Sequence, residues 1–446
     1  MSASPGETAK AIPEPTHASH VEDYLPGLAR ALPEPAVRAL NQVFAFWARL
    51  GFTRLIIVGV LLASMAFLSG PPKDEVLVRT GFFMLAALGL NVVVGLAGLL
   101  DLGYIAFMMI GAYTTALLTE STATIHPFIA GPWIALPFAV LAAMTAGIIL
   151  GIPTLRLRGD YLAIVTLGFH EILLQVAKNL EFVNFSRGMV NIPHPDFTLS
   201  RGTLTLVALV LFAIAAWLAR LVLRRDSERT SDLILGLLPA GFTAAFGIFL
   251  LIKGEISQEF NVLRPQDYWF ITVVFIVIAL FVIQRLKDSR IGRAWEAIRE
   301  DEVAAAAMGI PVVRMKLYAF AIGASTSGLS GWLLAVKVGF INPNTFPLLL
   351  SILTLCAVVL GGVGSSLGAL VGAAVVFGVP ELLRDLGFET VLGFDVETGR
   401  IAIFGVLLII TMIFRPGGLI SSTRRRAELA AGAADADETA AELREH

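Results

Sequence analysis

Few side chains in this sequence could take part in chemistry. Those that could do so lie within long apolar stretches and interrupt them. His170 and Glu171, for example, fall in the middle of one such stretch. An ionisable residue at membrane depth is costly, about 2.5–3.5 kcal/mol for Asp, Lys or Arg at the centre of a helix, and it tends to mark function. The candidates for a polar pathway across a membrane are Asn91, Asp101, Tyr104, Asp160, Thr166, His170 and Glu171.

Several of these residues also have an ordinary structural explanation. Asp101 and Asp160 stand beside glycines near the predicted cytoplasmic ends of their stretches, where a carboxylate can cap the next helix. His170 can be held by a local hydrogen bond, and Asn91 can bond a neighbouring helix. His170 and Glu171 are expected to face a protein interior or water rather than lipid. The sequence leaves the structural and the pathway roles open.

The chain lacks the residue sets that an enzyme would need. Its apolar stretches contain no His-x-x-x-His pair and no nucleophile beside a base. The phosphate-binding pattern G-x-x-x-x-G-K-[ST] is absent from the whole sequence. The single cysteine, Cys356, cannot form an intrachain disulfide or build a metal site. We therefore expect no bond chemistry, no metal and no cofactor in this chain.

The elements that carry the candidate residues are expected to be transmembrane helices. The chain is 56% hydrophobic and only 15% charged, with a mean hydropathy of +0.79. A soluble domain is about 25% charged. The pattern predicts an all-α, polytopic transmembrane bundle of about 10–12 spans, some of them re-entrant, because a span needs about 20 apolar residues. The apolar runs are 52–70, 81–100, 102–118, 131–151, 161–177, 203–222, 232–252, 268–286, 315–337, 346–363, 365–383 and 400–415.

One charged stretch between two apolar runs, 287–316, must project into water. Arg293–Met308 contains strong helix formers without internal Gly or Pro, and Gly309 is expected to end this helix. Its incomplete apolar stripe and charged face favour a docking helix for a cytoplasmic subunit, although a solvated connector on the membrane would look similar. The docking residues would be Arg293, Trp295, Glu296, Ile298, Arg299, Glu300, Glu302, Met308 and Gly309.

The basic residues predict the orientation of the chain in the membrane, and the glycines predict close helix packing. Most of the 33 lysines and arginines fall on the side that also holds the 287–316 loop and both termini, which the positive-inside rule assigns to the cytoplasm. Gly364, Gly368 and Gly372 recur at every fourth residue, which favours close helix packing. A moving interface between two subunits is the alternative for these glycines.

Five segments together resemble the permease subunits of ABC importers for branched-chain amino acids, in particular the longer M-type of the two paralogous permeases. They occur in the order found in that family and cover most of 80–420 outside one insertion. The segments are GLNVVVGLAGLLDLGYIAFMMIGAYTTALL (89–118), LRGDYLAIVTLGFHEI (157–172), SRIGRAWEAIREDEVAAAAMGIPVVRMKLYAF (289–320), LGGVGSSLGALVGAAV (360–375) and FRPGGL (414–419).

The resemblance implies an ABC-importer permease in the bacterial inner membrane, with residues 293–309 as the helix that contacts an ATP-binding subunit. The implied partners are a second permease, two cytoplasmic ATP-binding subunits that hold the ATP, and a soluble substrate-binding protein, with membrane lipid and no nucleic acid. A permease for urea or short amides would share these motifs. An ion-coupled secondary transporter would instead need paired carboxylates or broken helices at mid-membrane.

The resemblance fails in two places. Family members usually have a small residue where His170 stands, and residues 198–264 have no counterpart. The expected organisation is a cytoplasmic tail (1–48), a first transmembrane half (49–197), an inserted two-span hairpin (198–264), a second transmembrane half that contains the 287–316 loop (265–420) and a second cytoplasmic tail (421–446).

Overall fold

The computed structural model divides the chain into two compact units, 1–54 with 423–446, and 55–422. All structural statements below concern the second unit, so both predicted tails lie outside them. The structure describes residues 71–119, 130–154, 160–180, 187–199, 256–259, 265–381, 390–391, 394–395 and 418–420, with the single residues 59, 62 and 409.

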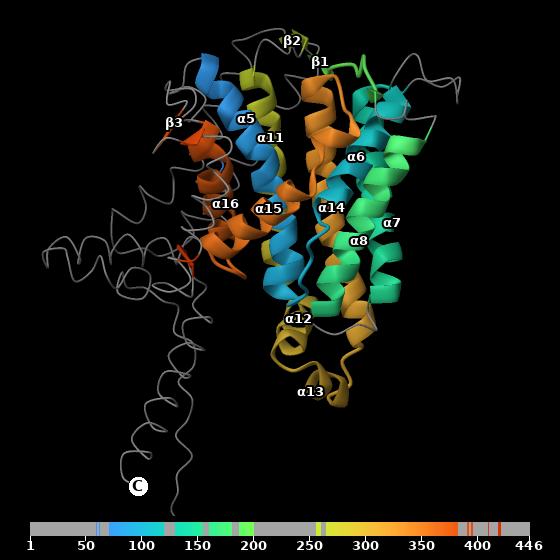
Figure 1. Ribbon diagram of the computed structural model, residues 1–446. Coiled ribbons are helices and arrows are strands. Elements are labelled where there is room, and N and C mark those ends of the chain that lie inside the picture. The colour runs from blue at the N-terminus through green and yellow to red at the C-terminus, as the bar shows by residue number, and fades with distance from the viewer. Residues whose placement is uncertain are drawn as a thin grey trace, which may run out of the picture. The chain divides into compact units, whose positions relative to one another are not determined.

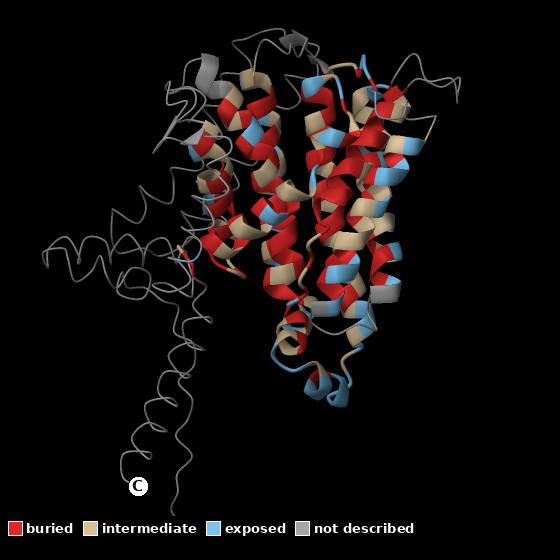
Figure 2. Cartoon of the chain, viewed as in Figure 1, coloured by how far each residue is buried: buried red, intermediate tan, exposed pale blue. Residues whose placement is uncertain are grey.

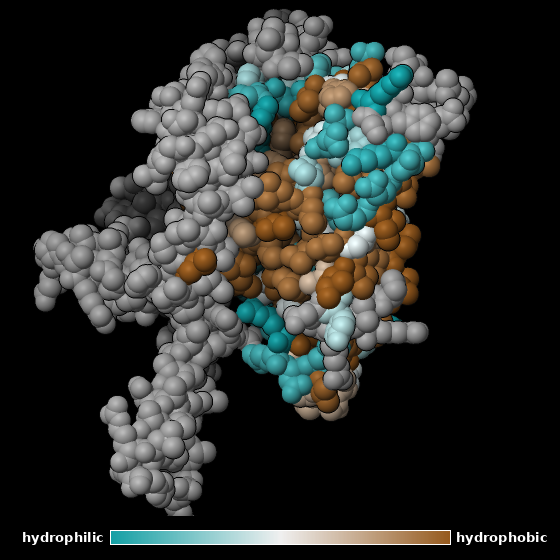
Figure 3. Space-filling view, in the orientation of Figure 1, coloured by the Kyte–Doolittle hydropathy of each residue, from teal (hydrophilic) through white to brown (hydrophobic). Residues whose placement is uncertain are grey.

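Long apolar helices make up most of the described chain (Figure 1). Six are long and apolar enough to cross a membrane. Hydrophobic residues dominate the middle of the face shown in Figure 3, and hydrophilic residues gather toward its two ends. The six are α5 (Pro71–Leu90) with the π-helix η1 (Asn91–Leu96), α7 (Pro132–Thr154), α8 (Asp160–Asn179), α11 (Pro265–Lys287), α14 (Val312–Val338) and α15 (Leu348–Gly361), the last with the short η4 (Pro343–Thr345) before it.

The remaining elements are shorter. α6 (Ile105–Thr119) and α16 (Ser366–Ala373), which continues into the π-helix η5 (Ala374–Gly378), are apolar. Two small antiparallel pairs were not predicted. β1 (Asp196–Leu199) pairs with β2 (Ile256–Glu259), and β3 (Thr390–Val391) pairs with β4 (Phe394–Asp395). The β1–β2 pair places Asp196 opposite Glu259 and so brings the two ends of the predicted insertion together.

Eight of the predicted apolar runs correspond to helices, and the helix boundaries follow simple rules. Pro71, Pro132 and Pro265 each begin a helix, where the missing amide proton of proline is not needed. Gly339, at φ 70°, follows the last residue of α14 in the left-handed conformation that ends a helix. The predicted runs 203–222 and 232–252 lie outside the described residues, and 52–70 and 400–415 lie almost entirely outside them.

The core forms around α14, which packs against α5, α6 and α7 (Figure 2). α5 and α14 run antiparallel, because Glu75 pairs with Lys337 at one end and Gly89 meets Gly323 further along. Each helix is followed by a connection and a shorter helix: α6 after α5 and η1, and α15 after α14 and η4. The amide of Ile105, at the start of α6, donates to Ser351 in the first turns of α15, so the two shorter helices meet near their first turns.

We expect that Gly331→Val lowers stability. A Cβ at Gly331 would collide with the carbonyl oxygen of Met108, because the backbones of α14 and α6 touch there. Overpacking of this kind costs about 1–3 kcal/mol. The melting temperature in detergent should fall by several degrees. Gly131→Ala is the control, because its Cβ would meet nothing within 4 Å. Equal melting temperatures for the two variants would contradict this packing.

Candidate functional site

Two short helices connect α11 to α14 beyond the ends of the long helices (Figure 1). α12 (Arg290–Glu300) starts at the N-cap Ser289, whose hydroxyl accepts hydrogen bonds from two amides of the first turn. α13 (Glu302–Ala307) follows after one residue. The charged loop predicted from the sequence is therefore helical and projects from the bundle.

The predicted single helix over 293–309 is wrong in one respect, because it breaks at Asp301. This residue is extended, at φ −151° and ψ 111°, and its carboxylate accepts hydrogen bonds from the amides of Val303 and Ala304 at 2.8 and 3.0 Å. Aspartate competes for backbone amides in this way and favours a new helix start over continuation. Gly309 adopts φ +82° and follows the last turn of α13, as predicted.

Two residues of α12 that were expected to contact a partner point into the chain itself. Trp295 is fully buried and donates from Nε1 to the Met315 carbonyl at 2.7 Å, and Ile298 is also buried. The exposed apolar surface lies on α13 and beyond it, where Val303 is 65% and Met308 84% exposed (Figure 2). We name Val303 and Met308 the α13 tip. Sequence reasoning found Met308 but missed Val303.

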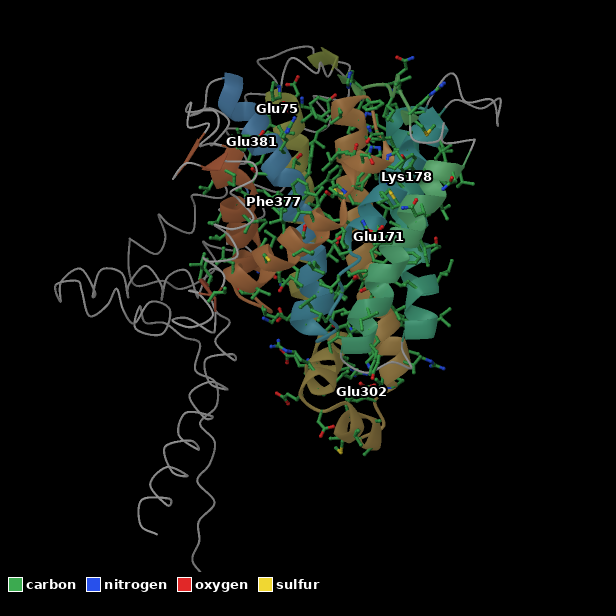
Figure 4. All side chains as sticks on the ribbon, viewed as in Figure 1. Glu75, Glu171, Lys178, Glu302, Phe377 and Glu381 are labelled. Carbon is green, nitrogen blue, oxygen red and sulfur yellow. The ribbon has the colours of Figure 1, made fainter. Side chains whose placement is uncertain are left out.

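The other predicted docking residues hold this element in place. Glu302 at the start of α13 forms a 2.7 Å ion pair with the buried Lys316 of α14 (Figure 4). The guanidinium of Arg293 donates to the Asp288 carbonyl at 3.1 Å. Glu296 is half-buried on α12, and Glu300 is exposed at its end. α13 is therefore tied to α14, and α12 is anchored at its start.

Arg299 links α12 to the transmembrane core. Its Nη1 donates to the carbonyl of Gly95 at 2.6 Å, inside the π-helix η1. Gly98 is in the left-handed region at φ +71°, and a Cβ there would lie 2.8 Å from the Arg299 Cγ. π-helical turns are rare and are frequently found at functional sites. Arg299, which was predicted to dock a partner, therefore bonds the π-helical end of the span formed by α5 and η1.

Residues predicted for three different roles come together at this point. The side-chain oxygen of Asn91 accepts a hydrogen bond from the amide of Gly364 at 2.8 Å, and Lys287 approaches the Gly364 carbonyl at 3.4 Å. A Cβ at Gly364 would lie 3.3 Å from the guanidinium of Arg299. The Arg299 cluster, made of Arg299, Gly95, Asn91 and Gly364, joins α12, η1 and the loop between α15 and α16.

Beyond this cluster the backbone is non-helical from Ala97 to Tyr104, and Figure 1 shows it rising between α5 and α14 to the start of α6. In this part of the chain the sequence predicted a break at the single residue Asp101. Non-helical backbone at membrane depth is tolerated where it is buried in protein or lines a cavity. Asp101 and Gly103 are buried, and the Asp101 carboxylate accepts from the Gly103 amide at 2.9 Å. Asp101 therefore caps a turn before α6 rather than the helix itself.

Three surrounding helices supply further hydrogen bonds to segment 97–104 and to the first amide of α6. The Leu102 amide donates to Thr166 of α8 at 3.0 Å, and the Tyr104 hydroxyl donates to the Gly323 carbonyl of α14 at 2.6 Å. The Ile105 amide donates to the Ser351 hydroxyl of α15 at 3.1 Å. Tyr104 and Thr166 are thus placed in one site, and Ser351, which sequence reasoning missed, completes it.

His170 and Glu171 diverge although they are neighbours. His170 is fully buried on α8, beside Gly103, whereas Glu171 is half-exposed on another side of the helix. Because they do not face a common cavity, they do not form the paired site that an ion-coupled transporter would use. Asp160 is the first residue of α8, and its side chain lies outside what the structure describes.

The glycine repeats pack helices within this chain. A Cβ at Gly368 would lie 2.5 Å from the Gly361 carbonyl oxygen, and one at Gly372 would collide with the Ala357 carbonyl. These glycines therefore let α15 and α16 touch. The packing interpretation is the one that the contacts favour, over an interface between subunits.

The long apolar helices, the broken segment among them and the projecting helix pair define a multi-pass helical membrane protein of the permease class. A family model described as "Branched-chain amino acid transport system / permease component" matches residues 74–414. The chain belongs to this family. No solved structure matches it.

Curated relatives agree with this assignment. The high-affinity branched-chain amino acid transport system permease protein LivM of Escherichia coli (strain K12) is 36% identical over 388 residues, which are 86% of this chain and 79% of that protein. The permease protein BraD of Pseudomonas aeruginosa is 31% identical over 205 residues, 45% of this chain and 58% of that protein. LivH of Escherichia coli (strain K12) is 29% identical over 150 residues, 33% and 45% of the two chains.

We expect that Arg299→Ala loosens segment 97–104 while α12 stays docked through Trp295. A hydrogen bond from a charged donor contributes about 1.5–3 kcal/mol, so amide exchange at 95–104 should accelerate by about tenfold or more. Hydrogen–deuterium exchange with mass spectrometry measures this. Arg293→Ala is the matched control, because its guanidinium bonds only the carbonyl of Asp288 among the interactions described. Unchanged exchange in Arg299→Ala would rule out the link.

Proposed function

We propose that this chain is a permease subunit of an ATP-binding-cassette importer and forms part of the translocation pathway for branched-chain amino acids in a bacterial inner membrane. Membership of the permease family and the name of the relative LivM support this substrate class. The chain itself makes and breaks no bond. ATP is bound by separate subunits, which drive alternating access from the cytoplasmic side.

The observation that carries the proposal is the α13 tip. Val303 and Met308 expose apolar surface on a polar element that projects from the bundle, next to charged residues of α12. An exposed apolar patch rimmed by polar groups marks a protein-interaction site. The pair of helices is also tied to the core by the Arg299 cluster and by the ion pair between Glu302 and Lys316. A push on the tip would therefore reach the broken segment 97–104.

The complex that we propose contains a second, homologous permease, two cytoplasmic ATP-binding subunits and a soluble substrate-binding protein. LivM and LivH are both named as permease proteins of the same transport system, and this chain is similar to each. The α12–α13 element lies on the cytoplasmic side in this proposal. Both termini and the tails 1–48 and 421–446 lie on that side as well, as the distribution of basic residues favours.

Substrate specificity would lie mainly in the binding protein. A branched-chain side chain needs only an apolar lining, and tight binding in the pathway would slow release. The described part of the chain fits this idea, because Asp101 and Tyr104, the polar side chains of segment 97–104, each bond a backbone group of the protein itself. Urea or a short amide is the alternative substrate that the same architecture could carry.

Uptake of leucine into proteoliposomes tests the function. The purified complex, with its binding protein, should import leucine only when ATP is supplied. ATP-dependent uptake of urea without leucine uptake would keep the class of transporter and change the substrate. Leucine uptake that is indifferent to ATP and driven by a sodium or proton gradient would contradict the proposal.

The double variant Val303→Glu with Met308→Glu tests the tip separately. Two carboxylates in a protein–protein contact should lower co-purification of the ATP-binding subunits by about tenfold or more, because central contact residues often contribute 2 kcal/mol or more. Val190→Glu is the matched control, since Val190 is 44% exposed outside the α12–α13 element. Normal co-purification of the double variant would show that the subunits dock elsewhere.

A further inference from the structure

Against the described residues of its own chain, α8 packs on one side. The buried side is formed by Leu162, Ala163, Thr166, His170, Leu174 and Ala177. The opposite side is broadly exposed and includes the apolar Val165, Ile172 and Val176. Within it, positions that alternate by three and four residues align along one stripe of the helix. We name this stripe the α8 outer face, and its residues are Tyr161, Ile164, Gly168, Glu171, Gln175 and Lys178. Figure 4 shows Glu171 and Lys178 on the same helix.

Gly168 leaves a vacancy at the middle of this face. A Cβ there would meet nothing within 4 Å. Other glycines of the described spans already pack against a neighbouring helix. A Cβ at Gly147 would collide with Ala324, and one at Gly328 would collide with Ala143. Small residues at membrane depth let two helix backbones approach closely. No described helix of this chain packs closely against Gly168.

Glu171 rules out lipid as the natural neighbour of the face. It lies at the centre of the span Tyr161–Asn179, is half-exposed, and has no hydrogen bond or ion pair among the described residues. A carboxylate at this depth requires a polar partner or water. α7 gives the contrast, because it contains no charged residue, and its exposed side carries Ile134, Phe138, Leu141, Ile149 and Ile152.

We infer that the α8 outer face is the surface against which the second permease subunit packs. A transmembrane helix of that subunit crosses α8 at Gly168 and presents a hydrogen-bond donor or a cation to Glu171. The alternating spacing of the face suits a shallow crossing of two long helices. This inference rests on the proposed function, which supplies the second permease, and adds which surface of this chain that subunit covers.

Photocrosslinking in the purified complex tests the contact. Benzoylphenylalanine is placed at Ile164 or Gln175 of α8, or at Phe138 or Ile149 of α7 as controls, and adducts are identified by mass spectrometry. We expect adducts with the second permease from both α8 positions and lipid adducts only from α7. Lipid adducts alone from α8, adducts within residues 203–252 of this chain, or adducts with a second copy would overturn the inference.

Gly168→Leu gives an independent measurement. It should lower the yield of co-purified second permease by about tenfold, because a larger side chain overpacks a close helix crossing. The melting temperature of the isolated chain should not fall, because a Cβ at Gly168 meets nothing within 4 Å. Thr145→Leu, on the exposed side of α7, is the control and should leave both unchanged. Full yield with Gly168→Leu would overturn the inference. A wild-type chain that purifies without any second permease would refute the proposed function itself.

Discussion

Backbone that leaves helical geometry at membrane depth must find hydrogen-bond partners inside the protein, because lipid offers none. Segment 97–104 and the start of α6 obey this constraint through contacts of their backbone with α8, α14 and α15, at Thr166, Ser327 and Ser351. Each partner belongs to a different helix. A shift of the segment would therefore rearrange the helices around it.

The Arg299 cluster connects the backbone next to segment 97–104 to the water-exposed helices α12 and α13. Trp295 anchors α12 to α14, and Arg299 joins α12 to the π-helical end of α5. The ion pair between Glu302 and Lys316 adds a second connection to α14. Because α5 and α14 also pack against each other, motion of α12 and α13 would be delivered to two long helices at once. Short polar contacts at helix ends are suited to such a role, since they can exchange without disrupting the apolar core.

Much of the fold could be predicted from the sequence, because apolar runs of span length directly identify helices in a membrane. The projecting helices were also predictable, from a charged stretch between two such runs. The candidate site was harder to predict from the sequence. The break around Asp101 extends to eight residues because of partners such as Ser351, which is 246 residues away from Ile105 and gives no local signal. The inward orientation of Trp295 and Ile298 likewise depends on α14. Asn91, Arg299 and Gly364 were each found, but for three separate roles.

The central claim is that Arg299 transmits motion from α12 to segment 97–104. The most direct test measures leucine uptake and ATP hydrolysis together in proteoliposomes that hold the complex with Arg299→Ala. The account predicts an uncoupled transporter, in which ATP hydrolysis continues while uptake is largely lost. Uptake per ATP equal to that of the wild-type complex would contradict it.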